Sequence, residues 1–466
     1  MDLRAVVSLL RARSELAAHD QWTREELLAG QASGLAELRA FALARSPFYR
    51  EFHRGFDDAP LEDLPVLSKA TVMEHFDELV TDPAVRLEDV EAHLRSTGPT
   101  GLFRGRYRVA ATGGTTGRRG VFLSDRSEWT HILASYARAN DWAGVPAGVR
   151  HRLKVAVVSS RNPAHQSSIV GATLASPLVP TLRLDASDPL ERTTAALTTF
   201  QPDSLVGYAS ILRALADEQL AGRLAVTPRA VMSASEVLTN ETRARIRAAF
   251  GVEPFNVYAA TETAGIASEC EYHRLHRYED LVIAEIVDEE NRPAPPGEFG
   301  AKLLVTVLFS RTQPLIRYEL TDRVRASADV CPDGRPFMLL DAIEGREEDL
   351  LHLEGVAIHP NVFHNVLEAV PVSAWQVVEE PDGLRILLAG PTADVVDADV
   401  ATGVRAALRR AGVSGVGVRV ERVNAIPRTA LGKAPLIRSL RRDHADAPGL
   451  LAARASTSEV SEDHGR

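Results

Sequence analysis

Thr112-Gly113-Gly114-Thr115-Thr116-Gly117-Arg118 is the stretch that most restricts the fold and chemistry of this chain. It holds three glycines and three threonines in seven residues. Glycine lets backbone N–H groups approach a ligand closely, threonine adds hydroxyl donors, and the planar guanidinium of arginine matches phosphate oxygens. The segment predicts either a polyphosphate-binding loop or a plain Gly/Thr hairpin turn.

The flanks of this loop exclude the commonest phosphate-binding loop. That loop has G-x-x-x-x-G-K-[ST] between a strand and a helix, and no lysine follows Gly117. Residues 107–111 and 120–124 both have the composition of strands. A helix begins only after them, with Asp125 and Glu128 forming a variant of the capping box. We therefore expect the loop to join two strands, as a mobile flap would.

Size and composition limit the function classes. The chain has 466 residues, of which 45% are hydrophobic and 25% charged, as in globular proteins with two or three domains. The net charge of −10 argues against nucleic-acid and anionic-membrane partners. Two cysteines, the absence of a signal-peptide pattern and the lack of a long apolar run lead us to expect a cytoplasmic protein. The oligomeric state is not readable, and a dimer is compatible with the sequence.

Strand and helix patterns alternate from about residue 150 to residue 260. Asp188 and Pro189 have the character of an N-cap and first helical residue, and Thr239 and Gly251 bound a later helix. This alternation predicts a mostly parallel sheet covered by helices, an α/β fold that binds ligands at the carboxyl ends of its strands.

The pattern changes after residue 280. Strands on either side of the Pro-rich turn 292–297 predict an antiparallel or barrel-like element. A small, mobile α+β domain is expected from residue 345. We therefore expect an N-terminal domain of residues 1–344, a C-terminal domain of residues 345–450 and a disordered tail of residues 451–466.

Further motifs follow the loop in a fixed order. Together they resemble the core motifs of the AMP-forming adenylating enzymes, a superfamily of acyl-CoA synthetases, peptide-synthetase adenylation domains and luciferases. The closest resemblance is to the phenylacetate–CoA ligase branch, and it covers roughly residues 60–440. The motifs are 233–239 (SASEVLT), 258–262 (YAATE), 314–322 (PLIRYELTD), 345–349 (GREED) and 427–433 (PRTALGK).

The resemblance implies a nucleotide site. The loop would embrace the β- and γ-phosphates of ATP, and the residues after two strands would border or stack on adenine. The ribose hydroxyls would bind an aspartate beside an arginine. In this chain the adenine residues are Ser235, Glu236, Tyr258 and Ala259, and the ribose residues are Asp322 and Arg346.

The resemblance also implies the catalytic residues. Thr261 would bind the α-phosphate, and Glu262 would hold Mg²⁺, which prefers carboxylate oxygen. Lys433 would bridge the substrate carboxylate and the α-phosphate. Glu348 falls at the hinge about which the C-terminal domain rotates between half-reactions. The acyl pocket is expected near Tyr208 and residues 233–235 and 260–265.

Several of these residues have structural alternatives. Tyr258 could be a core strand residue, Arg346 a helix-cap partner, and Asp322 half of an ion pair with Arg317. Lys433 could be a solvated loop residue. The order of the motifs favours the functional interpretation for Glu262, Asp322 and Lys433.

The sequence also departs from the usual motifs. Gly113 stands where a hydroxyl is usual, Ala259 replaces glycine, residues 319–321 replace a basic–Thr–Gly run, and Glu348 replaces aspartate. These changes bear more on the acid substrate and the second half-reaction than on the use of ATP.

A metal site is implied by the same branch, which often carries Cys, then His, then Cys-Pro-Cys. Cys270, His276 and Cys331 match this pattern, and Asp333 stands at the last cysteine. Carboxylate can ligate zinc, so a structural Cys₂-His-Asp zinc site is one interpretation, with His273 as an alternative fourth ligand. The other is that two half-buried cysteines remain from a lost site.

The resemblance implies an AMP-forming carboxylic acid ligase that uses ATP and Mg²⁺. It would join an aryl or short acyl carboxylate to AMP and pass the acyl group to a thiol, most directly coenzyme A. Adenylation with another acceptor or acid is an alternative: an amide ligase, or a nitrite-using activating enzyme of a natural-product pathway. A non-catalytic nucleotide-binding protein of the same fold is another. A serine hydrolase is excluded because no G-x-S-x-G is present.

Overall fold

The structure is a computed structural model that describes most of the chain. The described residues are 3–96, 98, 101–112, 119–148, 152–186, 188–346, 351–358, 361–367, 370–372, 374–427 and 437–438. Residues 113–118 of the loop, Glu348, Lys433 and the predicted tail lie outside them, and the side chain of Arg346 is not described.

The N-terminal hundred residues are mainly helical, as the sequence predicts. The second helix begins at a capping box in which Thr23 and Glu26 bond each other's backbone. The first helix packs on α7 through Leu9, Ala12 and Leu16. The helices are α1 (Leu3–His19), α2 (Arg24–Arg45), α3 (Pro47–Phe52), α4 (Lys69–Glu74), α5 (Phe76–Leu79), α6 (Leu87–Ser96) and, after the first strands, α7 (Arg126–Trp142), with a 3₁₀ turn at Leu61–Asp63.

Strands β1 (Arg108–Ala111) and β2 (Val121–Ser124) pair antiparallel, so the glycine-rich loop joins two strands as predicted. The predicted capping box that starts α7 is also confirmed, because Asp125 accepts hydrogen bonds from the first turn while Glu128 accepts from the Asp125 N–H. The helix follows β2 directly, so the loop is fixed at both ends by regular structure.

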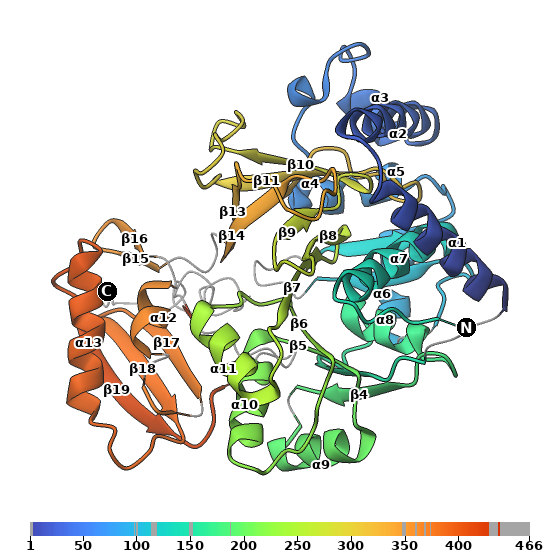
Figure 1. Ribbon diagram of the computed structural model, residues 1–466. Helices are drawn as coiled ribbons and strands as arrows, with labels where there is room; N and C mark the ends of the chain where they lie inside the picture. Colours follow the sequence, from blue (N-terminus) through green and yellow to red (C-terminus); the bar gives the residue numbers. More distant parts are fainter. Residues whose placement is uncertain are drawn as a thin grey trace, which may run out of the picture.

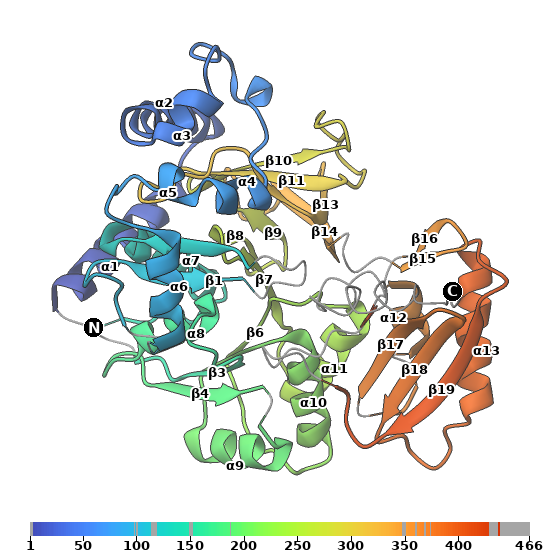
Figure 2. The ribbon, with the colours of Figure 1, turned by 180° about the vertical axis from the view of Figure 1, so that it is seen from behind.

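The predicted alternation of strands and helices builds a parallel sheet. Five strands pair parallel: β3 (Val155–Ser159), β4 (Thr181–Asp185), β5 (Ser204–Gly207), β6 (Ala230–Ala234) and β7 (Phe255–Ala260). Helix α7 packs against one face through Ala139, together with Val145 and Leu153. The helices between the strands are α8 (Gln166–Leu174), α9 (Leu190–Phe200), α10 (Ala209–Leu220) and α11 (Asn240–Phe250), and α9, α10 and α11 share one core cluster with the strands (Figures 1 and 2).

Antiparallel strands extend this sheet beyond β7, and the sequence patterns do not predict them. They are β8 (Ala264–Glu269), β9 (Leu275–Arg277), β13 (Asp322–Ala326) and β14 (Leu339–Arg346), which complete nine strands in the order β13-β14-β9-β8-β7-β6-β5-β3-β4. The antiparallel element expected after residue 280 is a separate sheet of β10 (Val282–Val287), β11 (Lys302–Val307) and β12 (Tyr318–Leu320).

Residues from Leu351 to Ile437 have a hydrophobic core of their own. A four-stranded sheet in the order β19-β18-β17-β20 carries α12 and α13, and Figure 1 shows it as the orange-to-red lobe. This agrees with the predicted α+β pattern. The elements are β15 (Leu351–Leu353), β16 (Val356–Ile358), α12 (Asn361–Leu367), β17 (Ala374–Glu380), β18 (Gly383–Ala389), α13 (Asp397–Arg410), β19 (Gly417–Val423) and β20 (Ile437–Arg438).

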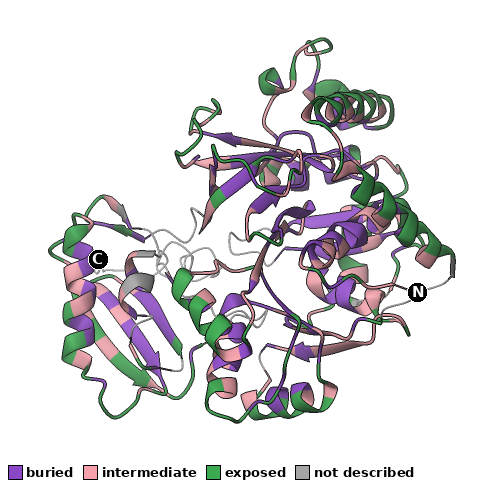
Figure 3. Cartoon of the chain, viewed as in Figure 1, coloured by how far each residue is buried: buried purple, intermediate pink, exposed green. Residues whose placement is uncertain are grey.

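One helix start differs from the prediction. Pro189, rather than Asp188, is the N-cap of α9, and no side chain caps this helix. The Asp188 N–H instead donates to the Asp185 carbonyl in the turn that leaves β4. Figure 3 shows that the central strands are buried and that exposed residues follow the outer helices. In the described part of the chain, no helix combines the length and the apolar character that a membrane span needs.

Candidate active site and metal centre

Thr112 and Gly120 close the base of the glycine-rich loop. The Thr112 N–H donates to the Gly120 carbonyl at 2.9 Å, and the Gly120 N–H donates to Thr112 Oγ1 at 2.9 Å. A Cβ on Gly120 would lie 2.9 Å from the Phe122 ring, so a side chain there would force a shift. The first residue predicted to bind phosphate is therefore a buried anchor of the hairpin.

A pocket with about 450 Å³ of empty space, part of it open to solvent, lies against this hairpin. Both hairpin strands contribute to its wall, and so does the turn that carries Thr261 and Glu262. The strands that flank the glycine-rich loop and the turn of the 258–262 motif therefore meet at one pocket. Its lining residues are Arg108, Ala110, Phe122, Leu123, Ser124, Glu128, Trp129, Ile132, Gln166, Thr261, Glu262, Thr263, Val307, Phe309, Ser310, Gln313 and Leu315.

The turn from Ala260 to Thr263 places Thr261 and Glu262 after the carboxyl end of β7. The Thr263 N–H donates to the Ala260 carbonyl at 3.3 Å, and Ala264 then adopts a left-handed φ of 66°. The Tyr318 hydroxyl donates to Glu262 Oε1 at 3.4 Å. The turn is thus tied to β12 as well as to β7.

Two buried polar side chains, Glu128 and Gln313, also line the pocket. Glu128 accepts hydrogen bonds from the backbone N–H groups of Arg311 and Thr312 and from the Thr312 hydroxyl. Burial raises the pKa of Glu128 although these hydrogen bonds oppose the shift. Gln313 accepts from the Leu123 N–H at 3.0 Å and donates to the Val121 carbonyl at 3.2 Å. The amide thus continues the hydrogen bonding of β2 on its free edge.

The predicted adenine residues lie at two neighbouring strand ends. Tyr258 and Ala259 belong to β7, where Tyr258 is buried and a bulge follows it. Ser235 is exposed just after β6, with a left-handed φ of 67°. Glu236 accepts a hydrogen bond from the Ser210 N–H at 2.8 Å, so its carboxylate caps the first turn of α10.

The predicted ribose residues are direct neighbours across two strands. Asp322 opens β13, is buried, and pairs in register with Arg346 at the end of β14. The sequence also allowed an ion pair between Asp322 and Arg317, but the structure gives Arg317 other partners. Arg317 instead bonds Glu285 and the Leu64 carbonyl.

Small residues near the expected acyl pocket pack against protein. A Cβ on Gly265 would lie 2.7 Å from the Tyr278 ring and 3.1 Å from Ser135 Oγ, and Ala264 is fully buried. The space beside Gly265 is therefore filled by a side chain. Tyr208 accepts a hydrogen bond from the Ser160 N–H at 2.9 Å, and burial raises the pKa of its hydroxyl.

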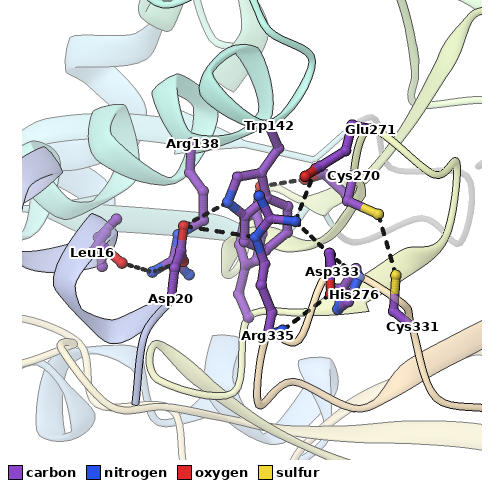
Figure 4. A network of polar contacts seen from close by, with 12 residues as sticks. Leu16, Asp20, Arg138, Trp142, Cys270, Glu271, His276, Cys331, Asp333 and Arg335 are labelled. Carbon is purple, nitrogen blue, oxygen red and sulfur yellow. Dashed lines mark hydrogen bonds and ion pairs between the residues drawn. The ribbon is translucent and has the colours of Figure 1, made fainter.

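The four residues of the predicted metal site come together. Potential ligand atoms of Cys270, His276, Cys331 and Asp333 lie within 4.8 Å of one another. The two sulfur atoms are 3.6 Å apart, and His276 Nε2 lies 3.0 Å from Asp333 Oδ2 (Figure 4). The alternative ligand His273 instead pairs with Glu269 at 3.1 Å. The cysteines are buried rather than half-buried.

This cluster is chemically suited to zinc. Two sulfurs, an imidazole nitrogen and a carboxylate oxygen form a ligand set that tetrahedral Zn²⁺ accepts. Burial raises the pKa of Cys270 to about 12 and also raises that of Cys331, so a bound cation would replace the thiol protons. Burial lowers the pKa of His276, which favours the neutral, ligating imidazole.

A network of charged side chains connects the cluster to α1 (Figure 4). Arg335 contacts Asp333 and lies 3.9 Å from Asp20, which also accepts a hydrogen bond from the Trp142 indole at 2.7 Å. Arg138 donates to the Leu16 carbonyl at 3.0 Å and forms two hydrogen bonds with Asp280. The N-terminal helix is thus joined to the metal-site loops by polar contacts as well as by apolar packing.

Sequence reasoning misses Arg108, Trp129, Gln166 and Gln313 in the pocket wall. None belongs to a recognised motif. The Arg108 guanidinium lies 5.7 Å from the Trp129 ring centre, and burial lowers the pKa of Arg108. A polar residue at the first position of α8 is the only local signal for Gln166. The two glutamines bond backbone atoms that are distant in the sequence, so no spacing could reveal them.

Comparison with known proteins shows which enzymes the chain resembles. Phenylacetate-coenzyme A ligase of Thermus thermophilus is 28% identical over 384 residues, which cover 77% of this chain and 80% of that one. The ligase of the same name from Escherichia coli is 27% identical over 267 residues, covering 54% of this chain and 58% of that one. No family model matches the chain.

A solved structure shares the fold over nearly the whole length. The crystal structure of 2-hydroxyisobutyryl-CoA ligase in the postadenylation state superposes with a TM-score of 0.71 at 20% identity, and the match covers 90% of each chain. The C-terminal lobe is therefore included in the shared fold. The sequence matches and this fold place the chain in the AMP-forming ligase superfamily, in its phenylacetate-coenzyme A ligase-like branch.

Proposed function

We propose that this chain is an AMP-forming acid–coenzyme A ligase. It activates a carboxylic acid with ATP as an acyl adenylate and passes the acyl group to the thiol of coenzyme A. One observation carries the proposal: the strands of the glycine-rich hairpin and the turn with Thr261 and Glu262 line the same pocket. The phenylacetate-coenzyme A ligases to which the chain is similar support the choice of acid and thiol.

The reaction consists of two group transfers. A carboxylate oxygen of the acid bonds to the α-phosphorus of ATP while the bond to the β-phosphate oxygen breaks, which yields acyl-AMP and pyrophosphate. The sulfur of coenzyme A then bonds to the acyl carbon, its proton is lost, and AMP leaves. We assign an aryl or short acyl acid to the first step.

Residues of this chain bind and orient the reactants. The hairpin loop would hold the departing phosphates, and Thr261 would hold the α-phosphate. The carboxylate of Glu262 is the hard oxygen donor that Mg²⁺ prefers, and Mg²⁺ when bound neutralises phosphate charge. Asp322 would hold the ribose. Lys433, outside the described residues, is proposed to stabilise the charge at the α-phosphate.

Pyrophosphate exchange tests the first step. The purified protein, given ATP, Mg²⁺, labelled pyrophosphate and one acid at a time, should move label into ATP with at least one aryl or short acyl acid. Adding coenzyme A should then give a thioester that mass spectrometry identifies. A folded protein that binds ATP but exchanges with no acid would favour a non-catalytic role, and a product formed only with an amine or with nitrite would favour the other acceptors.

We also propose a structural zinc ion at Cys270, His276, Cys331 and Asp333. Two thiolates and one carboxylate would carry three negative charges against the two positive charges of Zn²⁺, and the Arg335 guanidinium beside Asp333 would compensate the remainder. Metal analysis should find close to one zinc per chain. The two cysteines form no disulfide with each other, which also supports a reducing compartment, the cytoplasm, as the proposed location.

A further inference from the structure

Gln166 belongs to none of the motifs that carry the proposed function, yet it lines the pocket beside Thr261 and Glu262. It is the first residue of α8 and is only 6% exposed. Its Nε2 donates to the carbonyl oxygen of Thr261 at 3.1 Å, and its Oε1 accepts from the Tyr136 hydroxyl at 2.8 Å. A single buried amide therefore connects α7 to the backbone of the motif turn.

The orientation of this amide follows from its partners. A carbonyl oxygen can only accept a hydrogen bond, so Nε2 must face Thr261 and Oε1 must face Tyr136. Tyr136 must then be the donor, and burial keeps its hydroxyl protonated because it raises the pKa of this phenol. The hydrogen bonds run in one direction, from Tyr136 through Gln166 to Thr261.

The turn that receives this contact lies at the tip of the β7–β8 hairpin, where Ala260 pairs with Ala264. Beyond that pairing, one backbone hydrogen bond of 3.3 Å joins Thr263 to Ala260, and the Tyr318 hydroxyl donates to Glu262. The turn follows a β-bulge in β7 and precedes Ala264, whose left-handed backbone costs free energy in any residue with a Cβ. A contact from outside the turn can therefore decide where the Thr261 and Glu262 side chains lie.

We propose that Gln166 is a positioning residue for the nucleotide and its metal ion. By holding the Thr261 carbonyl, it fixes the turn at the distance from the hairpin at which the phosphates are bound. Without the amide, the carbonyl of the half-buried Thr261 would lose this donor, and the turn would be free to shift toward another partner. The inference rests on the proposed function and assigns Gln166 no contact with the reacting atoms.

The first test replaces the amide by a side chain of similar length that forms no hydrogen bond. Gln166→Met should raise the KM for Mg²⁺·ATP in pyrophosphate exchange about tenfold, which corresponds to about 1.4 kcal/mol. The KM for the acid should stay within about twofold. Gln219→Met is the matched control, because Gln219 also donates a side-chain amide hydrogen bond to a backbone carbonyl, that of Val226, at 3.0 Å, but in α10. Equal KM values for Mg²⁺·ATP in Gln166→Met and Gln219→Met would overturn the inference.

The second test uses the protonation of an isosteric acid. In Gln166→Glu, an ionised carboxylate cannot donate to Thr261, whereas the protonated acid can, while still accepting from Tyr136. The increase in the KM for Mg²⁺·ATP that this variant shows over the unmodified protein should shrink as the pH falls from 8 to 6. The increase shown by Gln166→Met should stay constant over the same range. A parallel defect at every pH would contradict the assigned geometry.

A third measurement separates this inference from the proposed function. Calorimetric binding of Mg²⁺·ATP requires no acid, so it can be compared in all variants even if the unmodified protein exchanges with none. Tyr136→Phe, which retains the ring and loses the donor to Gln166, should weaken this binding in the same direction as Gln166→Met. Unchanged binding in both variants would overturn the positioning role, and thermal unfolding would identify a variant that had simply lost its fold.

Discussion

The sulfur atoms of Cys270 and Cys331 lie 3.6 Å apart although 61 residues separate them in the chain. Two sulfurs bonded to one tetrahedral Zn²⁺ at about 2.3 Å each are separated by about 3.8 Å. The spacing therefore suits two thiolates on one ion. His276, in β9, and Asp333, two residues after Cys331, complete the ligand set.

Removal of one sulfur should release the zinc. Cys331→Ser replaces a soft ligand by a weak hard one, so the zinc content should fall from near one per chain to a small fraction, and the melting temperature should fall with it. His273→Ala is the control, because His273 pairs with Glu269 and lies outside the cluster. A native protein that neither contains zinc nor takes it up from solution would refute the site.

Loss of the Gln313 amide should loosen the glycine-rich hairpin. Gln313→Leu leaves the Val121 carbonyl and the Leu123 N–H without this partner in a buried place, and each such loss costs about 1–3 kcal/mol. Trypsin should therefore cleave after the exposed Arg119 about tenfold faster than in the unmodified protein, because cleavage requires local opening of β2. Mass spectrometry of the early fragments measures this rate. If the melting temperature fell while the rate of tryptic cleavage stayed unchanged, Gln313 would stabilise a part of the protein other than the hairpin.

Removal of the Arg138 charge should strongly destabilise the fold. Asp280 is buried between Arg138 and His19, and Arg138→Met would leave its carboxylate without its main partner. Breaking a buried pair in this way typically costs about 3–5 kcal/mol. Urea unfolding should show this loss, whereas Arg292→Met, which breaks exposed pairs with Asp288 and Glu290, should change the stability far less. A similar cost in both variants would show that the buried network contributes little.

His53 should make the fold less stable in mild acid. Burial, together with the positive charge of Arg39, lowers the pKa of His53 to about 4, whereas an unfolded chain has a value near 6.5. Above pH 6.5 both states are neutral, and as the pH falls from 6.5 to 4 only the unfolded state takes up the proton, so stability is lost over that range. In His53→Phe this part of the pH dependence should disappear. Unfolding free energies at pH 7.5 and pH 5 measure it, and an equal decrease in both proteins would contradict the assignment.

The parts of the fold that the sequence predicts well are those with local causes. The Asp125–Glu128 capping box and the Thr239 and Gly251 helix ends lie where the patterns place them, because capping depends on residues three or four apart. Strands β8, β9 and β13 are not predicted. Strand β8 is buried along its whole length and so lacks an alternating pattern, β9 has only three residues, and β13 depends on its pairing with β14.

The candidate site shows the same division. The order of motifs predicts Thr261 and Glu262, and the structure places both at the pocket of the hairpin. Gln166 and Gln313 escape prediction because they bond backbone atoms 95, 190 and 192 residues away, and Gln166 also bonds the Tyr136 hydroxyl 30 residues away. The choice of Asp333 over His273 as the fourth metal ligand also required the three-dimensional structure, because both residues have suitable ligand chemistry and spacing.

The contacts of α1 and α2 with late parts of the chain bear on synthesis at the ribosome. Arg24 bonds Glu279 and the Pro336 carbonyl, which lie 255 and 312 positions later. The start of α2 therefore cannot complete its native contacts until translation has passed residue 336, and the exit tunnel delays this further. During that interval this part of the chain is a natural target for holding chaperones, and a ribosome stalled before β14 would present it without these late partners.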